Sequence, residues 1–347
     1  MNNFTKLLLI LIFLGAVLFG FFYVKFKLSP TGFAAESFRF VVQENESVSA
    51  LAQRLVEKGV IRDAWYFQKY LTFHKLDKKI GAGEFVMNAP YTVAHVAEIL
   101  TRPGVSEETI TILPGWDLNE VANALVDKLP YFKKDEFVKL AGESARDYRG
   151  VKTKPSTNWG DLKILADRPK WATLEGYLPP DTFRVYKNST AEEVLRKLLV
   201  EREKQIDDNL WLDISASGRS FYEIMTMASV LEKEVRTESD RKIVADIFWR
   251  RYDMNWALQS DATVHYAVQK SGSMFTTSDD RDVDSPWNTY RYPGLPLGPI
   301  CMPSMTSIRA AVHPEKNDYW YFLTTKDGVV RYAKTLEEHN KNKIGAF

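Results

Sequence analysis

The sequence predicts an α+β protein with one apolar N-terminal segment, a small folded unit and a larger one. Its 347 residues are enough for about two domains at roughly 150 residues each. Stretches with the helical spacing of apolar residues alternate with short strands such as Glu108–Leu113, which reads ETITIL. The third observation is an uncharged run at the start, Leu7–Val24.

The composition excludes several classes of protein. Hydrophobic residues make up 45% and charged residues 26%, which is typical of a globular chain rather than a disordered one. The 46 Lys+Arg and 45 Asp+Glu residues balance, so there is no bulk electrostatic reason to bind nucleic acid. A single cysteine, Cys301, excludes an intramolecular disulfide, and the five histidines form no HExxH pattern. We therefore expect no metal and no cofactor.

The run Leu7–Val24 predicts a transmembrane anchor. As a helix it would span about 27 Å, close to the thickness of a hydrocarbon core. The alternative is a cleaved signal peptide, for which residues 33–35 (Phe-Ala-Ala) offer a weak site. The length of the run and the distance to that site favour an uncleaved anchor. We expect residues 7–24 to cross the membrane, with residues 1–6 as a short tail and the rest of the chain as one body on one side. Lysines flank the run at both ends, so charge alone does not orient it.

Residues 38–103 predict a compact α+β module. Phe38–Val42 and Glu84–Met87 have strand character, and helical spacing marks the segments that begin near Val48, Asp63 and Val93. Such a module is either a spacer or a small ligand-binding unit, and periodicity does not decide between them. Residues 107–347 form the second, larger domain.

A capped helix in the larger domain carries two candidate carboxylates. Ser220 and Glu223 form a capping box. The apolar residues that follow, Ile224, Ala228, Leu231 and Val235, define one stripe, and Glu232 and Glu234 flank it on opposite sides. A half-buried carboxyl loses solvation, which raises its pKa and makes it a usable general acid. The alternative is a solvated helix flank.

Two downstream segments combine polar, aromatic and turn residues. Gln259 and Asp261 lie in the first, and Asn288 and Tyr290 precede a Pro/Gly-rich stretch in the second. Rigid turns often present binding groups, and amides and aromatic faces suit sugars. An ordered core connection would also explain this composition.

These segments resemble the endolytic murein transglycosylase (YceG-like) family. The resemblance is carried by LEGYLPPDTF (Leu174–Phe183), MASVLEKE (Met227–Glu234), LQSDATVHYAV (Leu258–Val268), SPWNTYRYPGLPLGPI (Ser285–Ile300) and AAVHPEKNDYWYFL (Ala310–Leu323). It implies a LysM-like module and a lysozyme-like catalytic domain. The implied substrate is peptidoglycan, cut within the strand between N-acetylmuramic acid and N-acetylglucosamine. The implied product has a 1,6-anhydromuramic acid end, and the cut would end elongation of a nascent strand.

The resemblance also implies roles for single residues. Glu234 is the acid/base, with Glu232 as the second candidate. The other roles are expected from the residue types and not from the family: Gln259 and Asn288 would position an acetamido group, Tyr290 would contact an oxyanion or a hydroxyl, and Glu175 and Asp261 would support the site.

The resemblance implies a single-pass protein of the bacterial inner membrane, with residues 1–6 as a cytoplasmic tail and an extracytoplasmic body. It also makes peptidoglycan synthases candidate partners. Two rivals remain: a non-catalytic peptidoglycan-binding scaffold, and a lyase acting on a soluble substrate.

Overall fold

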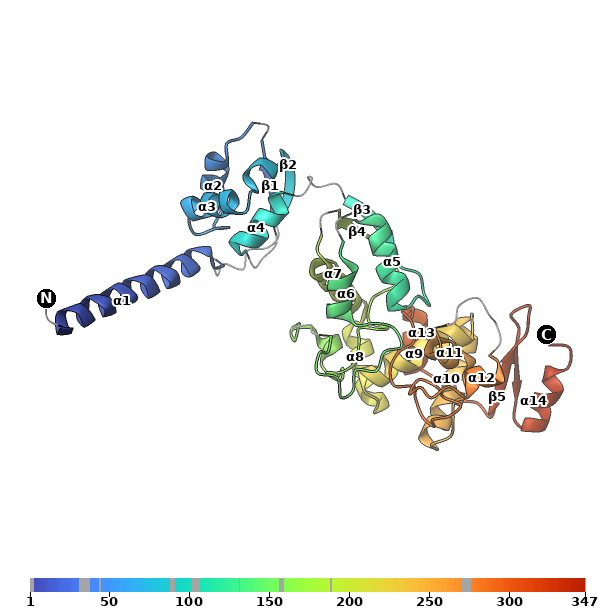
Figure 1. The fold of residues 1–347 in the computed structure, drawn as a ribbon. Coiled ribbons are helices and arrows are strands. Elements are labelled where there is room, and N and C mark those ends of the chain that lie inside the picture. The colour runs from blue at the N-terminus through green and yellow to red at the C-terminus, as the bar shows by residue number, and fades with distance from the viewer. Residues whose placement is uncertain are drawn as a thin grey trace. The chain divides into compact units, whose positions relative to one another are not determined.

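The computed structural model describes residues 3–30, 38–43, 45–87, 91–101, 107–130, 132–155, 159–187, 189–269 and 276–346. The side chains of residues 3–12, 38 and 107 lie outside this description. The chain divides into two compact units (Figure 1). The N-terminal unit runs to Glu107, and the C-terminal unit begins at Glu108, apart from residues 186–188.

The N-terminal unit joins one long helix to a small α+β fold. Its elements in order are α1 (Asn3–Leu28), β1 (Phe38–Val42), α2 (Val48–Glu57), α3 (Ala64–Phe73), η1 (Asp77–Lys79), β2 (Gly83–Met87) and α4 (Val93–Leu100). β1 and β2 pair antiparallel, with Phe40 opposite Phe85. Both of these side chains are buried together with Phe67 and Leu71 of α3. The strand–helix–helix–strand order therefore encloses a core of its own.

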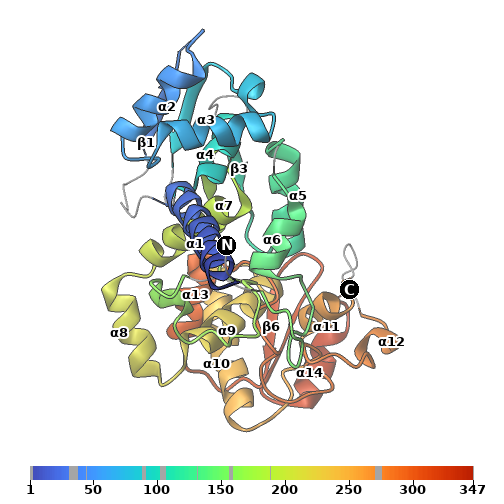
Figure 2. The same cartoon turned by 60° about the vertical axis from the view of Figure 1, so that its left-hand side comes forward.

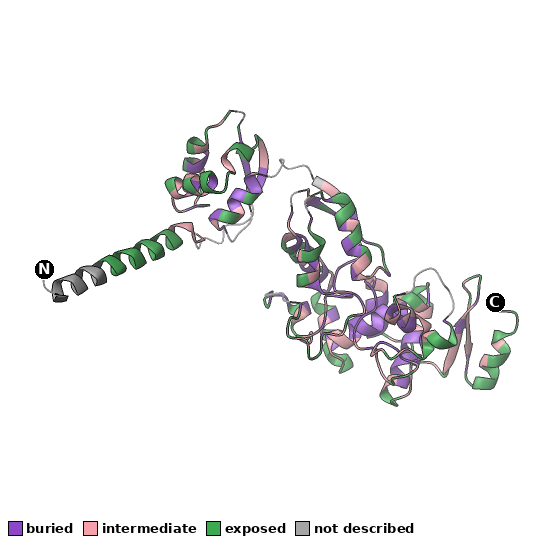
Figure 3. Cartoon of the chain, in the orientation of Figure 1, coloured by how far each residue is buried: buried purple, intermediate pink, exposed green. Residues whose placement is uncertain are grey.

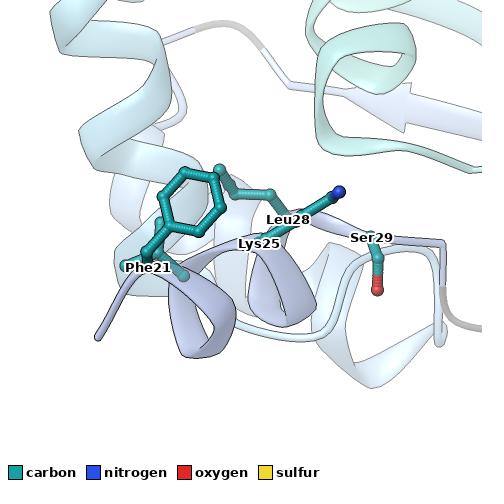
Figure 4. Close-up of a pocket in the computed structure, with 5 residues that line it drawn as sticks. Phe21, Lys25, Leu28 and Ser29 are labelled. Carbon is teal, nitrogen blue, oxygen red and sulfur yellow. The ribbon is translucent and has the colours of Figure 1, made fainter. Parts of the chain in front are cut away.

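The predicted anchor falls on α1. Within the described residues, no helix is long and apolar enough to cross a membrane. The side chains of residues 7–12, the first part of the predicted run, lie outside the described residues. On the described part of α1, an open apolar hollow is lined by Phe21, Val24, Lys25, Leu28 and Ser29 (Figure 4).

The C-terminal unit is mainly helical and contains short strand pairs. Its elements are β3 (Glu107–Thr111), α5 (Leu118–Lys128), α6 (Lys134–Ala141), η2 (Lys163–Leu165), β4 (Thr182–Tyr186), α7 (Ala191–Gln205), α8 (Asp208–Ser217), α9 (Phe221–Glu234), α10 (Glu238–Asp253), α11 (Asp261–Ala267), α12 (Ser278–Arg281), α13 (Met305–Val312), β5 (Tyr321–Thr324), β6 (Val330–Ala333) and α14 (Leu336–Lys343). β3 pairs with β4, and β5 pairs antiparallel with β6. The predicted α+β class is confirmed.

Helix α9 lies at the centre of this unit, packed against α10, α11 and α13 (Figure 2). Its middle is buried on all sides, including the polar Thr226 and Ser229 (Figure 3). The Ser229 hydroxyl accepts a hydrogen bond from the Ile300 N–H at 3.0 Å, which ties the Pro/Gly-rich segment to the helix. A helix so enclosed is a rigid support for any group at its end.

The predicted capping box at the start of α9 is confirmed, and the predicted apolar stripe is buried and continues one residue past the end of the helix. Ser220 accepts from the Glu223 N–H, and the Glu223 carboxylate accepts from the Ser220 N–H. At the other end, Val235 has an extended backbone, so it lies just outside the helix although it is buried. Glu234 is therefore the last helical residue, where the chain turns toward α10.

Candidate functional site

The carboxylate of Glu234 faces α11 across a short gap. Its Oε1 accepts a hydrogen bond from the hydroxyl of Ser260, the residue that precedes α11. The pKa of Glu234 is raised to about 7, chiefly because burial removes water from the carboxyl. The negative charge of Asp261 raises this pKa further, whereas the Ser260 hydrogen bond and the positive charge of Arg251 lower it. Glu234 therefore holds or releases a proton near neutral pH.

A strained turn directs Ser260 toward Glu234. Gln259 has a φ of +54°, in the left-handed region that non-glycine residues rarely adopt. Thr289 fixes the turn, because its carbonyl accepts from the Gln259 N–H and its hydroxyl from the Ser260 N–H, both at 3.1 Å. Thr263 then donates its hydroxyl to the Ser260 carbonyl at 2.7 Å. The segment predicted only as a polar stretch is thus the entry into α11, and the Gln259 side chain is left exposed beside it.

Asp261 and Tyr290 are brought together next to this turn. The Tyr290 hydroxyl donates to Asp261 Oδ1 at 2.8 Å, and the Thr276 hydroxyl donates to the same oxygen at 2.7 Å. Arg281 lies over the Tyr290 ring, 5.2 Å from its centroid. Burial raises the pKa of Tyr290, and the charges of Asp261 and Glu234 add to this effect. Tyr290 therefore keeps its hydroxyl proton and donates it in the hydrogen bond to Asp261.

Asn288, which was predicted to contact the substrate, instead lies inside a loop. It is fully buried, and its Nδ2 donates to the carbonyls of Arg281 at 2.7 Å and Val283 at 2.9 Å. Its Oδ1 accepts from the Tyr290 N–H at 3.0 Å. Both amide hydrogens are thus used inside the loop. In this arrangement Asn288 holds Tyr290 in place and does not present its amide to an acetamido group.

Glu232 differs sharply from Glu234 although only Lys233 separates them. Its Oε2 accepts from the Ser304 N–H at 2.8 Å and from the hydroxyls of Ser304 and Ser307 at 2.6 and 2.7 Å. Its Oε1 accepts from Arg241 at 2.9 Å. Since Ser304 caps α13, Glu232 joins α9 to the start of α13. Both carboxylate oxygens of Glu232 are occupied by hydrogen bonds that hold these helices together, which makes Glu232 a poor candidate for the acid/base residue.

Glu175 is a second carboxyl with a raised pKa, and it lies in the core. It accepts hydrogen bonds from the N–H of Leu118 at the start of α5, from the Ser144 hydroxyl at 3.0 Å and from the Tyr266 hydroxyl at 2.9 Å. Burial raises its pKa to about 8, and the charge of Asp117 contributes. With 1% of its surface exposed, Glu175 cannot meet a substrate in this structure. Through Tyr266 it anchors the C-terminal turn of α11, whose N-terminal end carries Ser260.

The glycine after Glu175 explains part of the Leu174–Phe183 segment. Gly176 has a φ of +85°, and a Cβ at this position would lie 2.6 Å from Cβ of Pro299. This glycine allows the segment to pack directly on the Pro/Gly-rich stretch, so two segments far apart in the sequence are locked together.

Sequence reasoning missed three residues of this site: Ser260, Arg251 and Tyr266. Arg251 is buried and donates to the Leu258 carbonyl at 2.8 Å, just before the strained turn. Ser260 and Tyr266 lie inside the quoted segment Leu258–Val268, but nothing local distinguishes them from other polar residues. Only their distant partners, Glu234 and Glu175, reveal their roles.

Comparisons with known proteins show the family to which the chain belongs. The model of one protein family, described as the YceG-like family, matches residues 40–344. The chain is 32% identical over 303 residues to an endolytic murein transglycosylase of Bacillus subtilis, covering 87% of this chain and 82% of that protein. It is 26% identical to an endolytic murein transglycosylase of Streptococcus pneumoniae over 93% of this chain, and it spans 61% of that longer relative. A crystal structure of a YceG-like protein from Listeria monocytogenes superposes with a TM-score of 0.57 at 31% identity, covering 89% of this chain and 99% of that one.

Proposed function

Because the chain belongs to the YceG-like family, we propose that it is an endolytic murein transglycosylase, a lyase that cuts peptidoglycan glycan strands internally. The bond broken joins N-acetylmuramic acid to N-acetylglucosamine, and the muramyl residue leaves with a 1,6-anhydro ring. The observation that carries this proposal is Glu234, a carboxyl with a pKa of about 7 bound to Ser260 at the end of a rigid helix.

One carboxyl is sufficient for this reaction. Protonated Glu234 gives its proton to the glycosidic oxygen, and the bond from that oxygen to the anomeric carbon breaks. The resulting carboxylate takes the proton of the muramyl 6-hydroxyl while O6 forms a new bond to the anomeric carbon. Glu234 ends protonated, as it began, and no water is consumed. A second catalytic carboxylate, which hydrolysing glycosidases use, is not needed.

The neighbours of Glu234 suit these two proton transfers. The Ser260 hydroxyl stabilises the carboxylate form that exists between the two steps, because it donates to the charged oxygen. Arg251 favours the same form through its charge. Tyr290 is neutral and lies beside Asp261, where it can offer a hydroxyl to a sugar. Gln259 is exposed on the strained turn and Asn288 is buried, so Gln259 is the amide that can reach an acetamido group.

The test is product analysis with purified full-length protein on isolated peptidoglycan. We expect fragments that end in 1,6-anhydromuramic acid and come from within the strands, read by mass spectrometry. Fragments with reducing muramic acid ends would mean hydrolysis and would overturn the proposal. Binding without release of fragments would support the rival scaffold hypothesis, and turnover of a soluble substrate would support the rival lyase.

The location of the protein belongs to the same proposal. The uncharged run Leu7–Val24 supports a single-pass anchor in the bacterial cytoplasmic membrane, and the substrate requires an extracytoplasmic body. Protease added to spheroplasts should digest that body, whereas protection of the whole chain would contradict this orientation.

The strand–helix–helix–strand unit supports a LysM-like glycan-binding role for residues 38–103. Deleting these residues should weaken cosedimentation of the protein with insoluble peptidoglycan. Unchanged cosedimentation would leave the unit as a spacer. Peptidoglycan synthases, which make the strand that this activity would end, are the partners that we propose.

A further inference from the structure

Large apolar side chains are exposed on two helices of the N-terminal unit. On α1, Phe22 and Phe26 have 62% and 55% of their surface exposed. On α3, Trp65 and Phe73 have 57% and 83% exposed. Figure 3 shows the exposed stretch of α1. A small module that leaves this much aromatic surface bare has a surface suited to a partner or a membrane.

The exposed side chains of α3 lie on one face. Trp65, Lys69 and Phe73 are spaced by four residues, so they follow one another along the helix. Phe67 and Leu71 point into the core on the other side and are fully buried. Helix α3 is therefore amphipathic in an unusual way, since its outer face is aromatic and basic rather than simply polar.

A row of ring contacts connects this face to α1. The Tyr23 ring on α1 meets Tyr66 of α3 at 6.2 Å between centroids, and Tyr66 meets Trp65 at 4.8 Å. A lysine lies over each end of the row, Lys27 at 5.6 Å from the Tyr23 centroid and Lys69 at 5.5 Å from the Trp65 centroid.

An ion pair fixes the two helices at the same place. Lys27 on α1 and Asp63, which caps α3, lie 2.9 Å apart. Tyr23 and Lys27 stand at the end of the uncharged run Leu7–Val24. If the run Leu7–Val24 crosses a bilayer, α1 leaves the hydrocarbon core near Tyr23 and Lys27. The contact between Lys27 and Asp63 therefore places the start of α3 close to the membrane surface.

We propose that the outer face of α3, formed by Trp65, Lys69 and Phe73, docks on the bilayer surface. Tryptophan and tyrosine favour the headgroup region because each combines an apolar ring with a polar group, and lysine places its ammonium group among lipid phosphates. Phe73 enters the upper acyl region, as in other interfacial helices. This inference rests on the proposed anchor. A glycan strand could also stack on aromatic rings, but the flanking lysines and the continuity with α1 favour an anionic membrane.

The experiment measures the depth of residue 73 in the full-length chain. The Phe73→Cys variant is labelled with an environment-sensitive fluorophore and placed in nanodiscs of phosphatidylcholine and phosphatidylglycerol. Because Cys301 is fully buried, labelling favours the introduced cysteine. Leu212→Cys is the matched control, since Leu212 on α8 is an exposed leucine, 68% exposed, in the other unit. We expect a blue shift and quenching by brominated lipid chains at position 73 and neither effect at position 212.

The other outcomes separate this inference from the proposals on which it rests. A chain that is retained in nanodiscs but shows no quenching at position 73 overturns the docking of α3 and leaves the anchor intact. A chain that does not stay in nanodiscs overturns the anchor, and the docking with it. A blue shift at position 73 that appears only after addition of purified glycan strands, without quenching by brominated lipid, would assign the face to glycan and overturn the membrane assignment.

Discussion

Ser260 donates its hydroxyl hydrogen to the Glu234 carboxylate, joining the residue before one helix to the last residue of another. This contact distinguishes Glu234 from the two other glutamates of the predicted site. Glu232 is saturated by a helix cap and an arginine, and Glu175 is enclosed in the core. Glu234 has a pKa raised to about 7 and keeps partial access to solvent.

Replacing Glu234 by glutamine should abolish most turnover. Glutamine keeps the size and polarity of the side chain but cannot exchange a proton, so we expect a loss of the order of 10²-fold or more in kcat. Release of anhydro-ended fragments measures the loss, and cosedimentation with peptidoglycan should be unchanged. Full activity of the folded variant would place the acid elsewhere, with Asp261 as the next candidate.

The Glu232→Gln variant is the matched control, and it should fail in a different way. The amide cannot accept all four hydrogen bonds that Glu232 receives, so the start of α13 is left partly unsatisfied. We expect the free energy of unfolding to fall by about 1–3 kcal/mol, measured by urea denaturation. Turnover per folded molecule should persist at a temperature where the variant is folded. The reverse pattern, normal stability with no turnover, would exchange the roles of the two carboxylates.

Removing the Ser260 hydroxyl should move the pH profile to higher pH. The hydroxyl lowers the pKa of Glu234 because it stabilises the charged form, so Ser260→Ala raises this pKa. Since Glu234 must start protonated, kcat/KM of the wild-type chain should fall as pH rises through about 7. In the variant we expect this alkaline limb about one pH unit higher. An unmoved limb would show that another group controls it.

The burial of Glu175 should make stability depend on pH. Its folded-state pKa of about 8 lies above its ordinary value of 4.5, so between these values the folded chain binds more protons than the unfolded chain. Stability therefore falls as pH rises through this window. Glu234 adds a smaller effect of the same sign, since its pKa of about 7 is also raised. Urea midpoints at pH 5 and pH 8 should differ less in Glu175→Gln than in the wild-type chain, and an equal difference would contradict this assignment.

Local signals in the sequence were enough to predict most of the fold. The capping box at Ser220 satisfies backbone groups within one helical turn, so it can be identified without knowledge of the rest of the chain. The apolar stripe did not mark the end of α9, because Val235 continues its spacing although the backbone there is extended. Burial pattern alone does not mark a helix end when the next residue is buried too.

The candidate site was only partly predictable because its contacts are not local. On the helix, Glu232 and Glu234 have equivalent positions beside the apolar stripe. What separates them is Ser304, 72 residues further on, and Ser260, 26 residues further on. Asn288 was predicted to face the substrate because its residue type suits an acetamido group. Its amide is held inside the loop by the backbone carbonyls of Arg281 and Val283. Backbone acceptors cannot be predicted from the residue types at those positions.

The bond between Tyr266 and Glu175 closes a loop of 91 residues, and this distance has a consequence for the order of folding. Contacts between distant residues form late, because chain entropy must be lost before they are gained. The Ser260–Glu234 contact joins residues only 26 apart, so we expect α11 to meet α9 before Leu174–Phe183 reaches Tyr266. We therefore expect the turn that holds Glu234 to assemble first, and the far end of α11 to be fixed only when the buried carboxyl of Glu175 joins the core.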